Sequence, residues 1–451
     1  AARSASLPSL FDFETLPNER LFAGYMGEPL FPENFSATEF LDQQRSLDDW
    51  VTFYEASTRL VEYLKYSGYN ALVLSVLAKG GAIYPSDRLQ PTPRYDTGIF
   101  ASTGQDPIRK DVLELLLRLC DREGIHLIPS LQFSTPLPML EEKRRQAGNQ
   151  KTGMLLTDAE GRIYRDPYAD DGNGNPIRYN PLHADVQQEV LQIVREMIDR
   201  YGTHSSFAGL AVDLSGRGCT VFPGPAWGRD PVTYQQFLAS RKQLSAVANA
   251  SGPDAIDEER AWLEWRANRL GEFHSKLSGQ LRADCPQAKL FIATAGVEVS
   301  PDLSEQLRPA LPNQVTPEQL LLGVGLAAKN YRHPRSGIVL LQSRVMAADF
   351  SQIDPAAAQE VGRSLSWDQP FAEIESVGHF IQSRPRSIRL PSFEKQSPFG
   401  AEATFLALAP HLVPTGADSR ELLVRDLARA NLDTIMIGGA MLPLGQEDAC
   451  R

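Results

Sequence analysis

The sequence predicts an α/β protein that forms a (β/α)8 TIM barrel with long loops on the carboxyl side of its strands. Short apolar runs rich in β-branched residues recur along the chain, and segments with helical spacing of apolar residues lie between them. Eight such runs occur, which is the number of strands in a closed barrel of this type. The length of 451 residues exceeds that of most single domains, but barrels reach this size when their loops carry insertions.

The first four predicted strands lie in the first half of the chain. They are residues 21–25, 71–77, 125–133 and 208–214. Apolar residues recur every three or four positions before each of the last three, which predicts helices within 47–66, 106–124 and 184–201. This alternation is typical of a parallel sheet that is covered by helices.

The other four predicted strands lie in the second half of the chain. They are residues 290–295, 338–341, 388–391 and 434–437. Long loops at 78–105 and 134–180 follow predicted strands, and barrels of this kind carry their sites in such loops. We therefore expect an N-terminal extension (1–18), a single barrel domain (19–440) and a C-terminal tail (441–451).

Composition and charge limit the class of ligand. Apolar residues make up 42% of the chain and charged residues 22%, which is typical of a globular protein with a sizeable core. The net charge of −11 is spread along the sequence without a basic run, which argues against nucleic acid and favours a neutral or cationic ligand. No stretch approaches the roughly 20 apolar residues that cross a bilayer, so we expect no membrane insertion.

No motif in the sequence supports a metal or another cofactor, and we expect none. The four cysteines, Cys120, Cys219, Cys285 and Cys450, are far apart and form no CxxC pair, so separate thiols are expected. The seven histidines show no HExxH motif. The chain also has no GxxxxGK[ST] phosphate loop and no GxSxG nucleophile motif.

Five blocks between about residues 68 and 296 carry a family resemblance. They are GYNALVLSVLAKGGAIYPS, DPIRKDVLELLLRLCDREGIHLIPSLQF, IRYNPLHADVQQEVLQIVREMIDRY, FAGLAVDLS and WLEWRANRLGEFHSKLSGQLRADCPQAKLFIATAG. In this order they resemble the family 10 glycosyl-hydrolase-like barrels, a bacterial group related to amylase-type glycoside hydrolases. The resemblance implies a barrel that hydrolyses a polysaccharide or an oligosaccharide, so carbohydrate is the expected partner.

The fourth strand departs from the pattern of that family. The family motif has a His two positions before its first Asp and a second Asp directly after it. Here Ala211 and Leu214 occupy these positions, and only Asp213 matches. The sequence therefore predicts one acid of the family type at this strand.

Cleavage of a glycosidic bond usually requires two carboxyl groups, one that donates a proton and one that acts as nucleophile or as base toward water. Asp213 ends the apolar strand AGLAVDL, where an acid is costly unless it faces a polar cleft, although it would also suit a turn cap. Glu298 lies just beyond the fifth strand, where amylase-like barrels place their general acid, and its alternative is a solvated loop residue.

A third acidic candidate follows the predicted seventh strand. Glu394 at this position would stabilise positive charge on the sugar ring in the transition state. The alternative is a surface ion pair with its neighbour Lys395. The predicted catalytic residues are therefore Asp213, Glu298 and Glu394.

Side chains suited to binding a sugar lie at or beyond the strand ends. The candidates are Tyr84, Arg94, Gln132, Asn180, Trp227 and Gln342. Each has a structural alternative, because aromatic residues also anchor loops and amides also fix turns. Trp227, in FPGPAWG after the fourth strand, is the first to test.

Two further functions stay open beside hydrolysis, because fold alone does not decide function. One is a carbohydrate-binding barrel without catalysis, and the other is a structural domain of a larger secreted or surface protein. The sequence begins AARSASLP without a methionine, which is compatible with removal of a leader or a further domain. We expect an extracytoplasmic or secreted protein because of what such barrels usually degrade, and the sequence indicates no oligomeric state.

Overall fold

A computed structural model gives the fold of the protein. The residues that it describes are 21–26, 35, 50–66, 68–78, 81–92, 111–148, 152–165, 178–214, 218–248, 255–293, 321–331, 337–345, 403–407 and 434–438.

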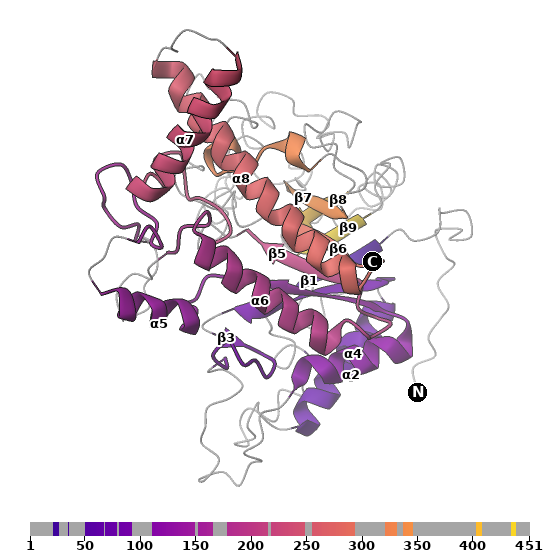
Figure 1. The fold of residues 1–451 in the computed structure, drawn as a ribbon. Coiled ribbons are helices and arrows are strands. Elements are labelled where there is room, and N and C mark those ends of the chain that lie inside the picture. Colours follow the sequence, from indigo (N-terminus) through magenta and orange to yellow (C-terminus); the bar gives the residue numbers. More distant parts are fainter. Residues whose placement is uncertain are drawn as a thin grey trace, which may run out of the picture.

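Eight parallel strands of the described chain form a closed ring (Figure 1). They are β1 (Leu21–Met26), β2 (Ala71–Ala78), β4 (His126–Leu131), β5 (Gly209–Asp213), β6 (Lys289–Ala293), β7 (Ile338–Val345), β8 (Ala403–Ala407) and β9 (Thr434–Gly438). Each strand pairs with the next in this order, and the ring closes because β1 pairs with both β2 and β9. This arrangement confirms the predicted barrel. A two-residue strand, β3 (Gly81–Ala82), pairs antiparallel with the end of β2.

The prediction for the seventh strand of the ring is wrong. The ring position between β7 and β9 is occupied by Ala403–Ala407, which pairs with both neighbours. Residues 388–391, which were predicted there, lie outside the described residues. The sequence ATFLALA was overlooked because alanine has a weak preference for strands, whereas IRLP reads as a short apolar run.

Helices lie outside the strand ring. The described ones are α2 (Trp50–Tyr66), α4 (Val112–Glu123), α5 (Pro138–Ala147), α6 (Ala184–Tyr201), α7 (Pro231–Ala248) and α8 (Ala255–Asp284), with a short 3-10 helix η3 (Ala328–Asn330). Helices α6 and α8 lie side by side along the barrel (Figure 1). None of the helices in the described part of the chain is both long and apolar enough to cross a membrane.

Helix α4 shows how the sequence fixes an element of the outer layer. The Asp111 carboxylate accepts a 2.9 Å hydrogen bond from the backbone N–H of Glu114 and so caps the first turn. Gly124 ends the helix in the left-handed conformation, with φ of 68°, which glycine adopts without a Cβ clash. Between these ends, Leu113, Leu116 and other apolar residues face the strands and are fully buried. Each such leucine contributes roughly 2 kcal/mol to folding.

Residues of the strands alternate between two apolar cores. The outer core lies between strands and helices and contains Leu72 and Leu74 of β2. The inner core fills the ring and is made of Ala23, Tyr25, Ala71, Val73, Ile128, Ala211, Phe291, Ala293 and Val339. Since side chains alternate along a strand, Asp213 faces the ring interior like Ala211, two positions before it.

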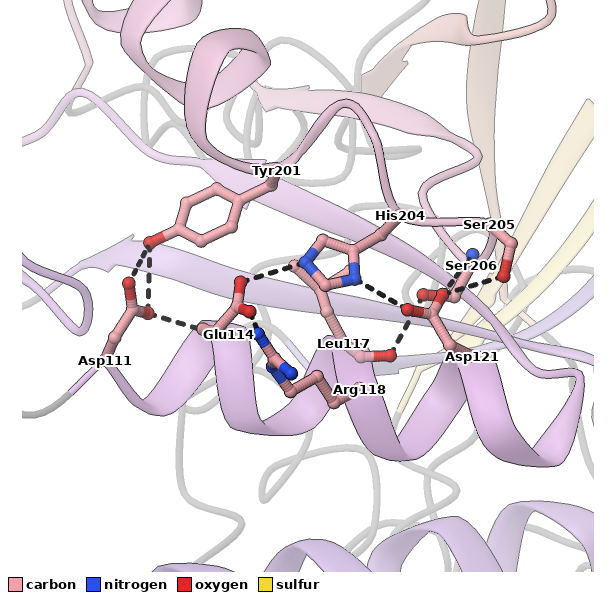
Figure 2. A network of polar contacts seen from close by, with 9 residues as sticks. All are labelled: Asp111, Glu114, Leu117, Arg118, Asp121, Tyr201, His204, Ser205 and Ser206. Carbon is pink, nitrogen blue, oxygen red and sulfur yellow. Dashed lines mark hydrogen bonds and ion pairs between the residues drawn. The ribbon is translucent and has the colours of Figure 1, made fainter.

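A polar network joins α4 to the segment that leads into β5 (Figure 2). The ring nitrogens of His204 lie 2.6 Å from an oxygen of Asp121 and 2.9 Å from an oxygen of Glu114. The Tyr201 hydroxyl donates to the Asp111 carboxylate at 2.9 Å. These contacts lie in the helix layer and at the amino end of β5, away from the carboxyl ends of the strands.

Candidate active site at the carboxyl ends of the strands

The centre of the candidate site is a pair of side chains inside the ring, Asp213 and Tyr25. The Tyr25 hydroxyl donates a 2.8 Å hydrogen bond to Oδ2 of Asp213. Tyr25 is the fifth residue of β1 and Asp213 the last residue of β5, so both lie at the carboxyl ends of their strands. Two strands, β2 and β4, stand between β1 and β5 in the ring, so this bond crosses the ring interior.

Asp213 is nearly enclosed, with 9% of its surface exposed. Its second oxygen, Oδ1, is buried and accepts no hydrogen bond from the described residues. Burial raises the pKa of Asp213 to about 6, and the hydrogen bond from Tyr25 opposes that rise because it stabilises the carboxylate. Asp213 is therefore an acid that changes its charge close to neutral pH, which is the range that acid–base chemistry requires.

Tyr25 acts as a neutral donor in this pair. Burial, followed by the charge of Asp213 and the hydrogen bond to it, raises the pKa of Tyr25 well above its ordinary value, and Ser130 acts in the opposite direction. The phenol therefore stays protonated across the physiological range, and its O–H donates a hydrogen bond to the carboxylate. A phenol that donates to Oδ2 favours the ionised form of Asp213 and fixes the orientation of its carboxyl group.

Two serines extend the polar surface of the ring interior. Ser75 of β2 and Ser130 of β4 are register partners, and Ser130 in turn pairs with Ala211 of β5. Both serines are at least 98% buried, and by alternation they share the inner face with Val73 and Ile128. We call Tyr25, Ser75, Ser130 and Asp213 the inner polar layer.

The two family positions that differ beside Asp213 have apolar roles here. Ala211 belongs to the inner core and Leu214 to the outer core, and both are fully buried. The backbone N–H of Leu214 donates to the carbonyl of Ala293 at 2.9 Å, which continues the pairing of β5 with β6. The described partner of Asp213 thus comes from β1 and not from its own strand.

The other two predicted acids cannot be placed beside Asp213. Glu298 and Glu394 both lie outside the described residues. The reason for choosing Glu394 also changes, because the seventh strand of the ring begins at Ala403, after Glu394. Glu394 therefore precedes that strand instead of following it.

Trp227 lies in the loop after β5, where the sequence predicted a sugar-stacking residue. Its ring is partly exposed and packs edge to face on Tyr164, with ring centroids 4.7 Å apart. The next two backbone N–H groups, of Gly228 and Arg229, donate to the carbonyl of Thr157 at 2.8 and 3.1 Å. The loop that carries Trp227 is thereby fixed to the loop that follows β4.

Arg266 of α8 also holds the loop that carries Trp227. It is fully buried, and its guanidinium donates to the carbonyls of Trp227, Gly224 (3.3 Å) and Gly323 (2.7 Å). The guanidinium carbon lies 4.3 Å from the ring centroid of Phe222, in cation–π geometry. Burial lowers the pKa of Arg266 to about 9, so the group stays charged at neutral pH. Arg266 therefore joins the loop after β5 to the segment around Gly323.

Two of the predicted binding residues are committed to contacts within the protein. Asn180 is fully buried, and its amide donates to Asp230 and Thr233 at 2.8 Å while its oxygen accepts from the N–H of Leu182 at 3.0 Å. Tyr84 is also fully buried and packs edge to face on Tyr201 in the outer core. These placements favour the structural alternative at both positions.

The remaining predicted binding residues are less defined. Gln132 directly follows β4, is partly exposed, and its backbone N–H donates to the carbonyl of Leu77 at 3.1 Å. Gln342 lies in β7 as the register partner of Thr404. Arg94 lies outside the described residues. Gln132 thus lies directly after its strand, as predicted, whereas Gln342 is the fifth of the eight residues of β7, because this strand continues to Val345 beyond its predicted end.

Sequence reasoning did not identify Tyr25 as a site residue. The signal was present in the first predicted strand, because alternation in LFAGYM puts Ala23 and Tyr25 on one face. The described residues also contain no group of three or more His, Cys, Asp or Glu side chains that could hold a metal ion.

Comparisons with known proteins agree with this architecture. One solved structure with the same fold is the PgaB (BpsB) glycoside hydrolase domain from Bordetella bronchiseptica, with a TM-score of 0.50 and 13% identity over 96% of this chain and 97% of that one. The catalytic domain of β-amylase from Paenibacillus polymyxa matches at a lower TM-score of 0.49, with 10% identity over 95% of this chain and 94% of that one. No curated protein sequence matches the chain.

The sequence pattern of one protein family covers more than half of the chain. The pattern described as glycosyl hydrolase-like 10 matches residues 45–308, a range that contains the strands β2 to β6 together with Asp213. This match confirms the resemblance that the ordered sequence blocks carry. The chain belongs to the glycosyl hydrolase-like 10 family.

Proposed function

We propose that this protein is a glycoside hydrolase that cleaves a polysaccharide or an oligosaccharide, with Asp213 acting in its ionised form. The observation that carries the proposal is the environment of Asp213 at the carboxyl end of β5. One oxygen is held by Tyr25, the other has no described partner, and burial brings the pKa to about 6. A buried acid of this kind reduces stability, so its presence where barrels hold their catalytic groups supports a chemical role.

The proposed reaction uses two carboxyl groups. The bond between the anomeric carbon and the leaving oxygen breaks, and the leaving oxygen takes a proton from the general acid. Asp213 either forms the new bond to the anomeric carbon or takes a proton from the water that does so, and the separation of the two carboxyl groups decides between these routes. Glu298 remains the proposed general acid, and Glu394 the proposed stabiliser of positive charge on the sugar.

The binding surface is proposed to include Trp227 together with Gln132, Gln342 and Arg94. Trp227 has a partly exposed ring on a loop that two other segments hold in place. A rigid aromatic face suits stacking against a sugar ring. The net charge of −11 favours a neutral or cationic polymer over an anionic one. An extracytoplasmic or secreted location is proposed because barrels of this kind usually degrade polysaccharides there.

One observation favours a second candidate function, a barrel that binds carbohydrate without cleaving it. Ala211 and Leu214 occupy the positions where the fourth-strand motif of the family has a His and a second Asp. Both are buried apolar residues here. We favour hydrolysis over binding alone because the pKa of Asp213 is raised to about 6 and its carboxylate accepts a hydrogen bond from Tyr25.

A screen for released reducing ends tests the proposal. The full chain is incubated with soluble starch, β-1,4-galactan, chitosan and polygalacturonate, beside the variants Asp213→Asn and Asp111→Asn. Asp111 is a matched control, because it also accepts from a tyrosine hydroxyl but lies in the helix layer, and asparagine caps a helix as well as aspartate does. We expect release from a neutral or cationic polymer by the wild type and by Asp111→Asn, and none by Asp213→Asn. Equal release by Asp213→Asn would contradict the assignment.

A further inference from the structure

Tyr25 differs from the other members of the inner core because it has a polar side-chain atom, which points at the candidate acid. The remaining members of the inner core carry no polar side-chain atoms. The Tyr25 hydroxyl reaches Oδ2 of Asp213 from across the ring, and the 2.8 Å distance is that of a well-formed hydrogen bond. The two residues lie 188 positions apart in the sequence, so barrel closure is what brings them together.

We propose that Tyr25 is a positioning residue for Asp213, whose hydroxyl holds Oδ2 and leaves Oδ1 as the oxygen that meets the substrate or the attacking water. This inference rests on the proposed function of Asp213 and adds a second residue and an assignment of each oxygen. The geometry supports it in two ways: Oδ2 has a fixed donor, and Oδ1 is buried without a partner among the described residues. A carboxylate held by one oxygen presents the other in a fixed direction.

The charges around Asp213 make the inference testable by pH. Of the described groups on the elements that pack around it, β1, β4 and β6, Tyr25 is the titratable side chain that changes the Asp213 pKa, and Ser130 of β4 and Ala293 of β6 are uncharged. Because the Tyr25 hydroxyl stabilises the ionised carboxyl, its removal raises the pKa of Asp213 further. If Asp213 acts ionised, the acid limb of the activity profile then moves to higher pH.

Tyr25→Phe is the variant that tests this inference, since it removes the hydroxyl and keeps the ring. Tyr201→Phe is the matched control, because Tyr201 is also buried and donates to the Asp111 carboxylate outside the ring. The assay follows kcat and KM from pH 4.5 to 9 on whichever polymer of the four-polymer screen the wild type cleaves. We expect Tyr25→Phe to lower kcat/KM at pH 6 by about 10- to 100-fold and to raise the pH of the acid limb by about one unit. The Tyr201→Phe profile should match the wild type.

A second measurement reports on the pair directly and requires no substrate. The carboxyl carbon of Asp213 is followed by NMR in protein labelled with ¹³C at aspartate carboxyls, and its signal is assigned by its absence in Asp213→Asn. We expect its pKa to rise in Tyr25→Phe and to stay unchanged in Tyr201→Phe. An unchanged Asp213 pKa or an unshifted acid limb in Tyr25→Phe would overturn the positioning role, even where Asp213→Asn is inactive. An active Asp213→Asn would instead overturn the proposed function itself.

Discussion

The Tyr25 hydroxyl lies 2.8 Å from Oδ2 of Asp213, and this bond joins the first strand of the barrel to the strand that carries the candidate acid. It places a neutral donor beside an acid that is only 9% exposed. The bond reduces the cost of holding a charge at this position but does not abolish it, since the pKa of Asp213 is still raised to about 6. The burial that suits Asp213 to chemistry near neutral pH should therefore also lower the free energy of unfolding of the protein.

Replacement of Asp213 by asparagine should stabilise the protein at neutral pH. The folded pKa of about 6 lies above the ordinary value of 3.8, so the native state loses stability as the pH rises from about 4 to 6. Above that window the cost is fully present, and a shift of about two pKa units corresponds to about 3 kcal/mol as an upper value. Urea unfolding should show Asp213→Asn to be more stable than the wild type at pH 7 and equal to it at pH 4. Equal stability at both pH values would mean that Asp213 is not held in a costly environment.

The network around His204 should make the opposite contribution. Burial lowers the pKa of His204, but the hydrogen bonds to Asp121 and Glu114 outweigh it and raise the pKa above 6.5. The stability from the charged ring is present below pH 6.5 and is lost as the pH rises through the folded pKa. His204→Gln should therefore cost roughly 1–3 kcal/mol at pH 5.5 and less at pH 9.

The control for that prediction is activity. His204 lies at the amino end of β5, and its ring contacts Glu114 and Asp121 of α4 (Figure 2). The kcat/KM of His204→Gln at pH 7, measured at a temperature where the variant is folded, should equal that of the wild type. A cost that did not change between pH 5.5 and 9 would contradict the charged state of the ring.

Arg266 should be needed both for stability and for the shape of the loop that carries Trp227. Arg266→Met leaves the carbonyls of Gly224, Trp227 and Gly323 without their donor, which should cost roughly 2–4 kcal/mol. Because Trp227 is the proposed stacking residue, KM should also rise. Arg260→Met on the same helix is the control, since the Arg260 side chain is 76% exposed and its ion pair among the described residues is with Glu264. It should change stability by less than about 0.5 kcal/mol. Similar costs for the two variants would argue against the anchoring role.

Gly209 should be required where β5 begins. A Cβ at this position would lie 2.0 Å from the carbonyl oxygen of Lys289, and the φ of 151° is unfavourable for other residues. Gly209→Ala should therefore displace β5 from β6 and lower the thermal midpoint by several degrees. Gly279→Ala in α8 is the control, because among the described residues no atom beyond the neighbouring helix backbone lies within 4 Å of the added Cβ, and alanine favours a helix. The control should be as stable as the wild type or slightly more so.

The sequence predicted the architecture better than it predicted the site. Strands such as Ala71–Ala78 were found because β-branched residues and leucines fill them without interruption, and α6 was found because its apolar residues recur at helical spacing. The strand Ala403–Ala407 was missed because two of its five residues are alanine. A local pattern of this kind does not reveal which of two weak runs pairs with the neighbouring strands.

The site was harder to predict because its parts meet only when the barrel closes. Asp213 was found from its position at the end of an apolar strand, but its partner Tyr25 lies 188 residues away and looks like an ordinary core residue. The sequence predicts Asn180 and Tyr84 as sugar-binding residues, but both are fully buried. Asn180 fixes loop geometry through its hydrogen bonds, and Tyr84 packs against Tyr201. Exposure and pairing are properties of the fold, and residue type alone does not contain them.

The most direct test of the catalytic role of Asp213 compares the wild type with Asp213→Asn at pH 7. Both kcat/KM and affinity are measured on the polymer that the wild type cleaves. Loss of an ionised carboxylate that acts on the reacting atoms should lower kcat/KM by roughly 1,000-fold or more, while binding measured by calorimetry stays within about threefold. Asp213→Asn should therefore fold and bind the polymer without cleaving it. A variant that cleaves the polymer within about twofold of the wild-type rate would contradict the central role of Asp213.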